Sequence, residues 1–370
     1  MFWSCALAAE GGPQLHPILK ECAVPPQQTR DGSELLGNVD LRRRLLSLGS
    51  EGRLHHCLLF EGPEGVGKAT TARWLAKTIN CEAEPAVRPC GGCWSCRTIE
   101  KGHHPDVIFV GTDPERSSRV VSVRQARELI KSLVLRPHSA RRRFVIIDPA
   151  DAMNAESANA LLKTFEEPPQ DTGFILVTGQ AGALLTTVRS RSQRVRFGRV
   201  DHAELAAWLR ARGLDEADWL ARLSDGCPGR ALALSEGAAE EWRSARDDLL
   251  AALSGDLSGL FAFGENRAKG ERAVWSTRVI LALDGLERML QDAWRWHVRG
   301  GLPQHDLYNP RQMKRVAAWA ERLDAGAVVR CGAAIDEAKA QLAAFVNGRM
   351  LVDALLCRLA TELGPARKVS

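Results

Sequence analysis

Two segments typical of a nucleotide-binding core enclose a cluster of four cysteines, and this order constrains the fold more than any other feature of the chain. The first segment is a glycine-rich loop, Gly62-Pro63-Glu64-Gly65-Val66-Gly67-Lys68. The second is an apolar strand that ends in an acid, Phe144-Val145-Ile146-Ile147-Asp148. Between them lie Cys81, Cys90, Cys93 and Cys96. Such an insertion is rare in a nucleotide-binding core, so the order predicts an ATPase-like domain with its own metal-binding module.

The composition is that of an ordinary soluble globular protein. The chain has 370 residues, of which 45% are hydrophobic and 26% are charged, and this length suffices for two or three domains. A formal net charge of +5 permits contact with nucleic acid but does not predict it. No run approaches the roughly 18 apolar residues that would cross a bilayer, so we expect no membrane association.

The cysteines and the N-terminal segment bear on the compartment. Four of the ten cysteines are clustered and six are scattered through apolar segments, which is not the pattern of a disulfide framework. We therefore expect the reducing cytoplasm. Residues 1–30 are proline-containing, and their apolar start at 1–9 lacks the basic residues of a signal peptide. We therefore expect them to be a loose leader or the result of a misplaced start.

Helices and short apolar strands alternate from about residue 31 to residue 197, as in an α/β domain with a mostly parallel sheet. Strands are predicted at 57–60, 107–110, 144–147 and 174–178, and helices at 69–79, 123–135 and 155–165. In the helix predicted at 123–135, Val123, Ala126, Ile130 and Val134 share one face and are expected to be buried. After residue 197 no strand is predicted. We expect a helical lid at 198–238 and an all-α collar domain at 239–370.

The glycine loop fits the phosphate-binding consensus at Gly62, Gly65, Gly67 and Lys68, in which backbone N–H groups surround the phosphates and the lysine neutralises them. The consensus continues with a serine or threonine whose hydroxyl binds magnesium, but this chain has Ala69. Thr70 lies roughly 100° further round the helix and is no easy substitute. Whether the loop still holds ATP or ADP is left open.

The acid-tipped strand carries a second departure. In an active ATPase of this type the aspartate that holds magnesium is followed by a glutamate that activates water, whereas here Asp148 is followed by Pro149. Proline cannot act as a general base, and the next carboxylate is Asp151. The two losses affect the two functions that hydrolysis needs, so we interpret the site as a degenerate ATPase site.

The four cysteines are separated by eight, two and two residues. Thiolates at this spacing can close a tetrahedral Zn–S4 site, which is structural because it leaves no open position. Redox-active or inert thiols are the alternatives. His103 and His104 lie nearby and are interpreted as surface or turn residues, because four cysteines already complete the site.

Two arginine triplets, at 42–44 and 141–143, are the strongest local concentrations of positive charge. We interpret the first as a solvated helix face and the second as a charged loop before a strand. Contact of either triplet with DNA is left open.

A resemblance to a known family becomes clear in two further segments. Residues 159–169, Asn-Ala-Leu-Leu-Lys-Thr-Phe-Glu-Glu-Pro-Pro, resemble the signature helix of bacterial clamp-loader subunits, which are AAA+ proteins of DNA polymerase III. Residues 187–192 look like the Ser-Arg-Cys motif of that family, with Ser192 in place of the cysteine. The resemblance is close over 54–232, and 347–359 are similar to the last collar helix of the family.

The resemblance implies one of two kinds of subunit. The tau/gamma motor subunits keep the magnesium-binding hydroxyl and the catalytic glutamate, whereas the delta-prime subunit, or stator, commonly lacks them. Ala69 and Pro149 favour the delta-prime kind. The alternative is an ATP-hydrolysing motor subunit of the same complex. A small-molecule kinase, a third reading, would need neither the thiol cluster nor the segment at 159–169.

By the same resemblance, Arg191 would be an arginine finger that reaches the ATP site of a neighbouring motor subunit. Arg230 would occupy the sensor-2 turn and Thr178 the sensor-1 position, although each could have a packing role only. The implied partners are the motor and delta subunits and, through the complex, the sliding clamp and primer–template DNA.

Overall fold

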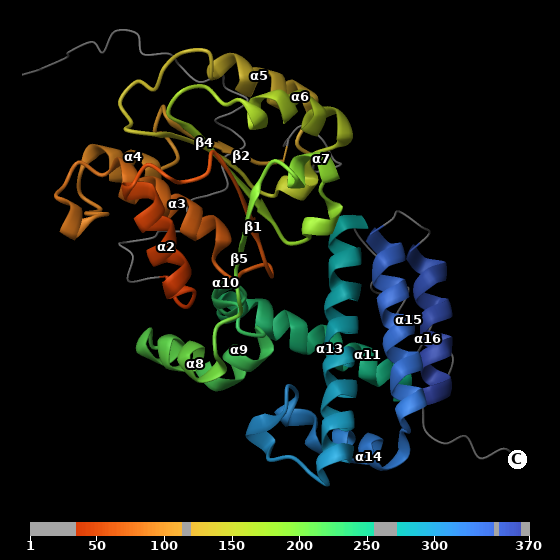
Figure 1. The fold of residues 1–370 in the computed structure, drawn as a ribbon. Coiled ribbons are helices and arrows are strands. Elements are labelled where there is room, and N and C mark those ends of the chain that lie inside the picture. Colours follow the sequence, from red (N-terminus) through yellow and green to blue (C-terminus); the bar gives the residue numbers. More distant parts are fainter. Residues whose placement is uncertain (1–34, 113–119, 255–271, 344–347, 364–370) are drawn as a thin grey trace, which may run out of the picture. The chain divides into compact units, whose positions relative to one another are not determined.

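The computed structural model describes residues 35–112, 120–254, 272–343 and 348–363, and the expected leader at 1–30 lies outside them (Figure 1). The chain divides into two compact units. The first comprises residues 1–208 and 225–230, and the second comprises 209–224 and 231–370. The boundary thus falls inside the segment predicted as a lid, and α8 (His202–Ala211) and α10 (Pro228–Ala233) each contribute to both units.

The first unit is built on one parallel sheet of five strands in the order β2-β3-β4-β1-β5. The strands are β1 (Cys57–Glu61), β2 (Val107–Val110), β3 (Arg143–Ile147), β4 (Thr172–Thr178) and β5 (Gln193–Arg196). The four predicted strands are confirmed. β5 was missed because it is polar, and only Val195 in it is buried.

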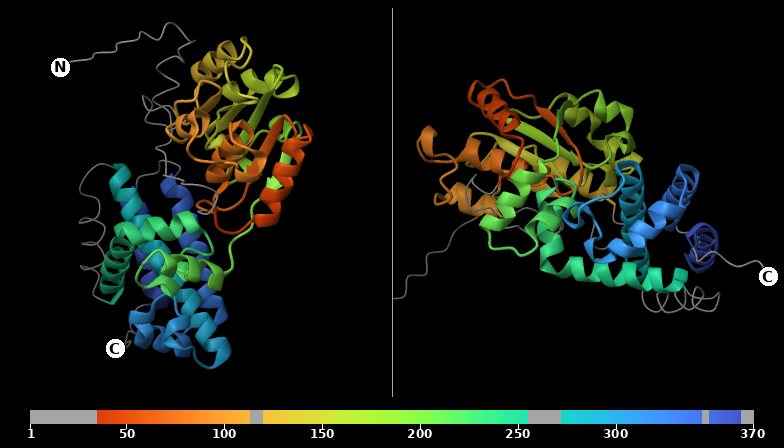
Figure 2. Two further views of the ribbon diagram at one scale, coloured as in Figure 1. Left: turned by 90° about the vertical axis from the view of Figure 1, so that its left-hand side faces the viewer. Right: turned by 90° about the horizontal axis from the view of Figure 1, so that it is seen from below.

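Helices cover both faces of this sheet, as Figure 1 and the two views of Figure 2 show. They are α2 (Val39–Ser50), α3 (Lys68–Asn80) and α4 (Trp94–Glu100) on one face, and α5 (Val123–Ser132), α6 (Ala155–Glu166) and α7 (Thr186–Arg189) on the other. Alternate strand residues serve the two cores: Leu58 and Phe60 pack toward α3, whereas Leu59 packs toward α6. Burial on both faces explains why these strands read as continuous apolar runs.

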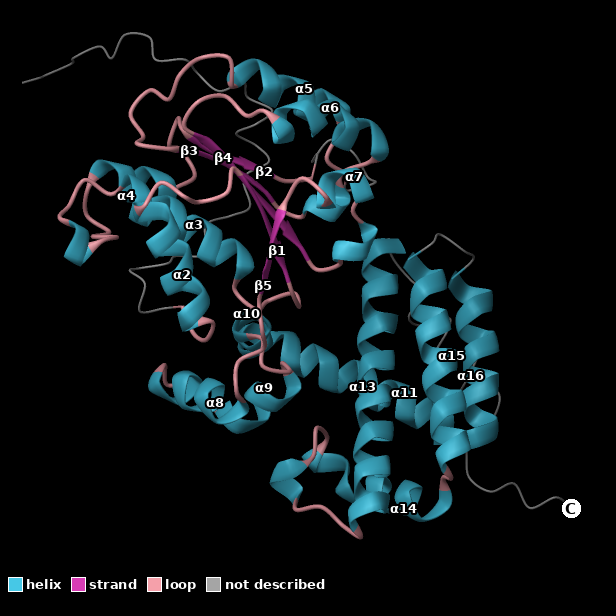
Figure 3. Cartoon of the chain, viewed as in Figure 1, coloured by secondary structure: helices cyan, strands magenta, loops and turns pink. Residues whose placement is uncertain are grey.

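The second unit contains helices and loops but no strand in its described residues (Figure 3). Its helices are α9 (Ala217–Leu223), α11 (Ala239–Ser254), α13 (Arg272–Arg299), α14 (Met313–Arg322), α15 (Ala325–Ala343) and α16 (Gly348–Leu363). One apolar core runs through α11 and α13 to α16. The prediction of an all-α C-terminal domain is confirmed.

Two details of the sequence interpretation are wrong. Helix α5 ends at Ser132, so Val134 lies beyond it and is 79% exposed, while Leu129 and Leu133 are buried instead. Contrary to expectation, Arg143 does not belong to the charged loop before the strand. It begins β3, is 4% exposed and forms an ion pair with Asp106.

Candidate functional site

The glycine loop connects the end of β1 to the start of α3. Gly62, Gly65 and Gly67 have φ values of 150°, 76° and 99°, which residues with a side chain rarely adopt. A Cβ atom on Gly62 would also lie 2.6 Å from the carbonyl oxygen of Phe197. One on Gly65 would lie 2.8 Å from the backbone nitrogen of Arg230. The loop therefore requires glycine both for its backbone shape and for its close packing.

Lys68, the first residue of α3, is directed back onto this loop. Its Nζ atom donates to the carbonyl oxygens of Gly62 and Pro63, at 2.7 and 2.6 Å. The side chain is buried, and burial lowers the pKa of the ammonium group, against the attraction of nearby Asp148. A bound phosphate would take the place of the two carbonyls as the partner of this charge.

Asp148 follows β3 and faces the same region. Burial raises the pKa of its carboxyl group to about 6, the positive charge of Lys68 opposes the shift, and the negative charge of Asp151 adds to it. The structure therefore brings together the lysine and the aspartate that sequence analysis assigned to one site.

The two groups that hydrolysis would need are absent from this arrangement. Ala69 offers no hydroxyl beside Lys68, and the exposed Pro149 stands where a general base would follow Asp148. Asp151 lies close enough to influence the pKa of Asp148, and one of its carboxylate oxygens is buried without a hydrogen-bond partner in the described residues. No carboxylate is supplied at position 149 itself.

The turn that contains Arg230 packs on the glycine loop, within the same unit. The backbone N–H of Gly229, in α10, donates to the carbonyl oxygen of Gly65 at 2.8 Å. The guanidinium of Arg230 lies 4.0 Å from the carboxylate of Asp225. At the other predicted sensor position, Thr178 is buried at the end of β4, and its hydroxyl accepts a hydrogen bond from the backbone of Gln180 at 2.9 Å. Both positions thus have local contacts of their own.

Arg191 lies in the turn between α7 and β5. Its guanidinium donates to the carbonyl oxygen of Thr187 at 3.0 Å and forms an ion pair with Glu166, the last residue of α6. The side chain is 34% exposed. The following residue, Ser192, donates to the carbonyl oxygen of Val188 at 2.8 Å and lies 3.3 Å from the sulfur of Cys57. These contacts hold the turn, and with it the arginine, at the surface.

Glu61 is a residue of this region that sequence analysis missed. It ends β1 next to the glycine loop, and its buried carboxylate accepts hydrogen bonds from Arg194 at 2.7 and 2.9 Å and from Arg196 at 2.8 Å. Burial works to raise its pKa, but the two guanidinium groups outweigh it and lower the pKa. Glu61 thus links the glycine loop to β5, which follows the Arg191 turn. The alternating arginines of 194 and 196 were the available signal.

The four predicted metal ligands converge. The sulfur atoms of Cys81, Cys90, Cys93 and Cys96 all lie within 4.8 Å of one another. Zn–S bonds of about 2.3 Å would place four tetrahedral sulfurs roughly 3.8 Å apart, so the cluster has the size of a metal-binding site. Cys81 and Cys96 are buried, whereas Cys90 is exposed.

Backbone N–H groups support the thiols in a way that suits thiolate ligands. The N–H groups of Cys90, Cys93 and Cys96 donate to the sulfurs of Cys81, Cys90 and Cys93, respectively, at 3.3–3.4 Å. Donation from the backbone of Cys93 and Gly92 lowers the pKa of the Cys90 thiol to about 7. Burial raises the pKa of Cys96, a cost that a metal cation would offset.

Of the two nearby histidines, His103 is exposed as expected, but the interpretation of His104 as a surface or turn residue is wrong. His104 is fully buried, its ring lies 5.1 Å from that of Trp94, and its Nδ1 accepts from the backbone N–H of Asp106 at 3.0 Å. It supports the segment that follows the thiol cluster and is not one of the converging ligands.

Within the described residues no helix combines the length and the apolar character needed to span a membrane. A family model described as "DNA polymerase III, delta subunit" matches residues 38–201. The chain is 31% identical to DNA polymerase III subunit delta' of Escherichia coli over 253 residues, which are 66% of this chain and 74% of that protein.

Other relatives include both kinds of subunit. DNA polymerase III subunit delta' of Pseudomonas aeruginosa is 34% identical over 49% of this chain and 56% of its own length. Subunit tau of Escherichia coli is 38% identical over 43% of this chain but only 24% of its own length. Among solved structures, a gamma subunit-related protein of Thermotoga maritima aligns over 86% of this chain and 99% of its own, with 16% identity and a TM-score of 0.43.

Proposed function

Because the chain belongs to the family of DNA polymerase III clamp-loader subunits, we propose that it is the delta-prime, or stator, subunit of that complex. It would assemble with the tau/gamma motor subunits and with delta in the cytoplasm, and the complex would load the sliding clamp on primer–template DNA. The contribution of this chain would be architectural, together with Arg191 supplied to the ATP site of a motor subunit.

One observation carries the choice between the two kinds of subunit. The glycine loop is well formed, with Lys68 and Asp148 beside it, yet Ala69 and Pro149 stand where the magnesium-binding hydroxyl and the general base are needed. This combination favours a subunit that keeps the fold of the nucleotide site but does not hydrolyse ATP. The alternative is a motor subunit, which the similarity to tau supports and the two substitutions disfavour.

Assembly tests this proposal. The purified chain, mixed with the tau/gamma and delta subunits of the same organism, should co-elute with them in size-exclusion chromatography, and the assembled complex should hydrolyse ATP when clamp and primed DNA are added. Elution of this chain apart from the other subunits at micromolar concentrations would contradict a stator role.

We further propose that the thiol cluster holds a structural zinc ion. The four cysteines would be the ligands, and the ion would complete a small core between the C-terminal end of α3 and the N-terminal end of α4. These helices are also joined by an ion pair of 2.7 Å between Lys77 and Glu100. The N–H···S contacts and the convergence of the sulfurs support this assignment.

The variant Cys93→Ser should lose most of its zinc, because the hydroxyl of serine is a poor ligand for the ion. Hydrogen exchange should become faster at residues 81–104, while the amides of α13 and α15 keep their protection, since they belong to the other unit. The matched control is Cys357→Ser, which removes an exposed thiol outside the cluster. A full equivalent of zinc in Cys93→Ser, measured by atomic emission, would overturn the assignment.

A further inference from the structure

A groove of about 910 Å³ opens at the N-terminal ends of the strands, at the opposite end of the sheet from the glycine loop. It lies where β3 and β4 begin, whereas the glycine loop and Asp148 follow the ends of β1 and β3. The lining comes from the end of α2 and the segment between it and β1, from the end of α3, and from the segment between Cys81 and Cys90. The two loops that lead into β3 and β4 complete it. Neither the nucleotide site nor the Arg191 turn contributes to it.

The lining of the groove combines apolar side chains with an excess of positive charge. Its apolar side chains are Leu46, Leu54, Ile79, Pro85, Pro168 and Pro169. Three guanidinium groups line it, those of Arg88, Arg141 and Arg142, against a single carboxylate, that of Asp171. Burial lowers the pKa of the His56 imidazole and so disfavours its charged form. The charge of the lining is therefore clearly positive.

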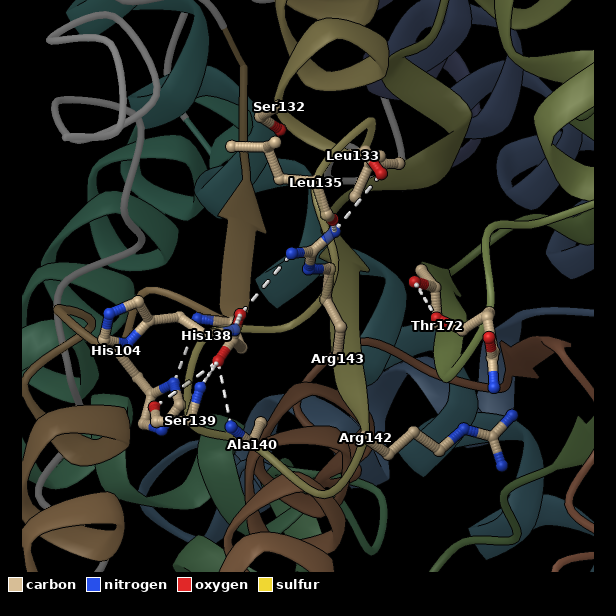
Figure 4. Close-up of polar contacts among 12 residues, drawn as sticks. His104, Ser132, Leu133, Leu135, His138, Ser139, Ala140, Arg142, Arg143 and Thr172 are labelled. Carbon is tan, nitrogen blue, oxygen red and sulfur yellow. Dashed lines mark hydrogen bonds and ion pairs between the residues drawn. The ribbon is translucent and has the colours of Figure 1, made fainter. Parts of the chain in front are cut away.

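A buried carboxylate holds the loop that carries two of these arginines (Figure 4). Asp106, at 1% exposure, accepts hydrogen bonds from the consecutive backbone N–H groups of His138, Ser139 and Ala140 at 2.8, 2.8 and 2.9 Å. It also forms an ion pair with Arg143 at 3.5 Å. The loop is thus anchored immediately before and immediately after Arg141 and Arg142.

Arg142 is anchored directly. Its backbone N–H donates to the side chain of Asn80 at 3.1 Å, and the Asn80 amide donates back to its carbonyl oxygen at 2.9 Å. Its guanidinium donates to the carbonyl oxygen of Leu54 at 3.2 and 3.3 Å. Arg141, by contrast, is exposed, and its guanidinium has no hydrogen-bond or ion-pair partner within the described residues. The anchored loop thus presents Arg141, whose guanidinium N–H groups are available to a ligand.

We propose that this groove binds a short extended segment of a partner protein in which acidic and apolar side chains are combined. The apolar residues of the segment would pack against the leucine, isoleucine and proline side chains of the lining, and its carboxylates would pair with Arg141 and Arg88. Pre-organisation of the loop by Asp106 lowers the entropy lost on binding. A nucleic acid fits less well, because the lining has no aromatic platform other than the half-buried His56.

The experiment begins with a phage-displayed library of random 12-residue peptides, selected on the immobilised full-length chain. Enriched sequences should combine aspartate or glutamate with leucine, proline or phenylalanine. One such peptide is then labelled with fluorescein, and its binding to the full-length chain is measured by fluorescence anisotropy. Selection of sequences without an acidic excess, or no enrichment at all, would overturn the proposal.

The decisive comparison is between two charge reversals in the same loop. Arg141→Glu should weaken binding of the peptide by at least about tenfold, because it replaces an attraction by a repulsion. Arg136→Glu is the matched control: Arg136 is exposed but does not line the groove, so binding should change by less than about twofold. Equal effects of the two variants would refute the groove as the site. Tighter binding of a labelled single-stranded oligonucleotide, also lost in Arg141→Glu, would identify a nucleic-acid site instead.

Discussion

Replacing Arg191 with alanine is expected to abolish most of the ATP turnover at the motor-subunit site that we propose it completes, while the clamp-loader complex stays assembled. A guanidinium that stabilises the charge developing on the γ-phosphate typically contributes about 10³–10⁵ in rate. Alanine at position 191 removes that contribution entirely. The measurement is the DNA- and clamp-stimulated ATPase rate of the complex rebuilt with wild-type or variant chain, after chromatography has shown equal assembly.

The structure explains why this substitution should spare the fold. The ion pair of Arg191 with Glu166 is partly exposed, and pairs of that kind contribute only about 0–1 kcal/mol to stability. The same weakness would let the guanidinium leave Glu166 for a phosphate. Arg189→Ala, two residues earlier on α7, is the control and should retain the wild-type rate. An unchanged rate in Arg191→Ala would make this residue a structural arginine and would remove the trans contribution from the proposal.

Asp106→Ala is expected to lower the free energy of unfolding of the first unit by about 3–5 kcal/mol, because it leaves the buried guanidinium of Arg143 without its carboxylate. It also strips three backbone N–H groups of their acceptor. The measurement is urea denaturation combined with hydrogen exchange of peptides from β2 and β3. The control Asp40→Ala removes an exposed carboxylate paired with Arg43 and should cost less than about 1 kcal/mol.

The contribution of Asp106 to the free energy of unfolding should decrease as the pH falls. Burial works to raise the pKa of Asp106 in the folded chain, but the backbone donors and Arg143 outweigh it and lower the pKa. A carboxyl group with a lowered pKa stabilises the fold above its unfolded pKa of about 3.9, and this contribution is lost as the pH falls through the folded value. Wild type and Asp106→Ala should therefore converge in stability at low pH. A difference that grew on acidification would contradict the assigned role of this carboxylate.

Much of the α/β unit could be predicted from the sequence because its signals are local. The glycine loop, the apolar strands β1 to β4 and the proline stop after α6 each depend on residues adjacent in the chain. The convergence of Cys81 with Cys96 was also predictable, since short spacing leaves the ligands little freedom. Strand β5 was missed because it is short and polar, although Arg194 and Arg196 alternate with apolar residues as in a half-buried strand.

What could not be predicted depends on partners distant in sequence. The triplet at 141–143 forms one charged run in the sequence, yet Arg142 donates hydrogen bonds to Leu54 and Arg143 pairs with Asp106, so Arg141 alone of the three is exposed. Glu61 could not be distinguished from a solvated acid until β5 was placed beside β1. Since loop length and sheet order determine these pairings, the spacing of the residues alone does not reveal them.

The most direct test of the stator assignment is a complex in which every motor subunit carries a substitution of its own phosphate-loop lysine and only this chain is wild type. The stimulated ATPase rate of that complex, measured with clamp and primed DNA, should not exceed the rate without protein, because Ala69 and Pro149 leave this chain without a magnesium-binding hydroxyl and a general base. Turnover that increases with the concentration of the complex and disappears when Asp148→Asn is introduced in this chain would show instead that it is a working motor subunit.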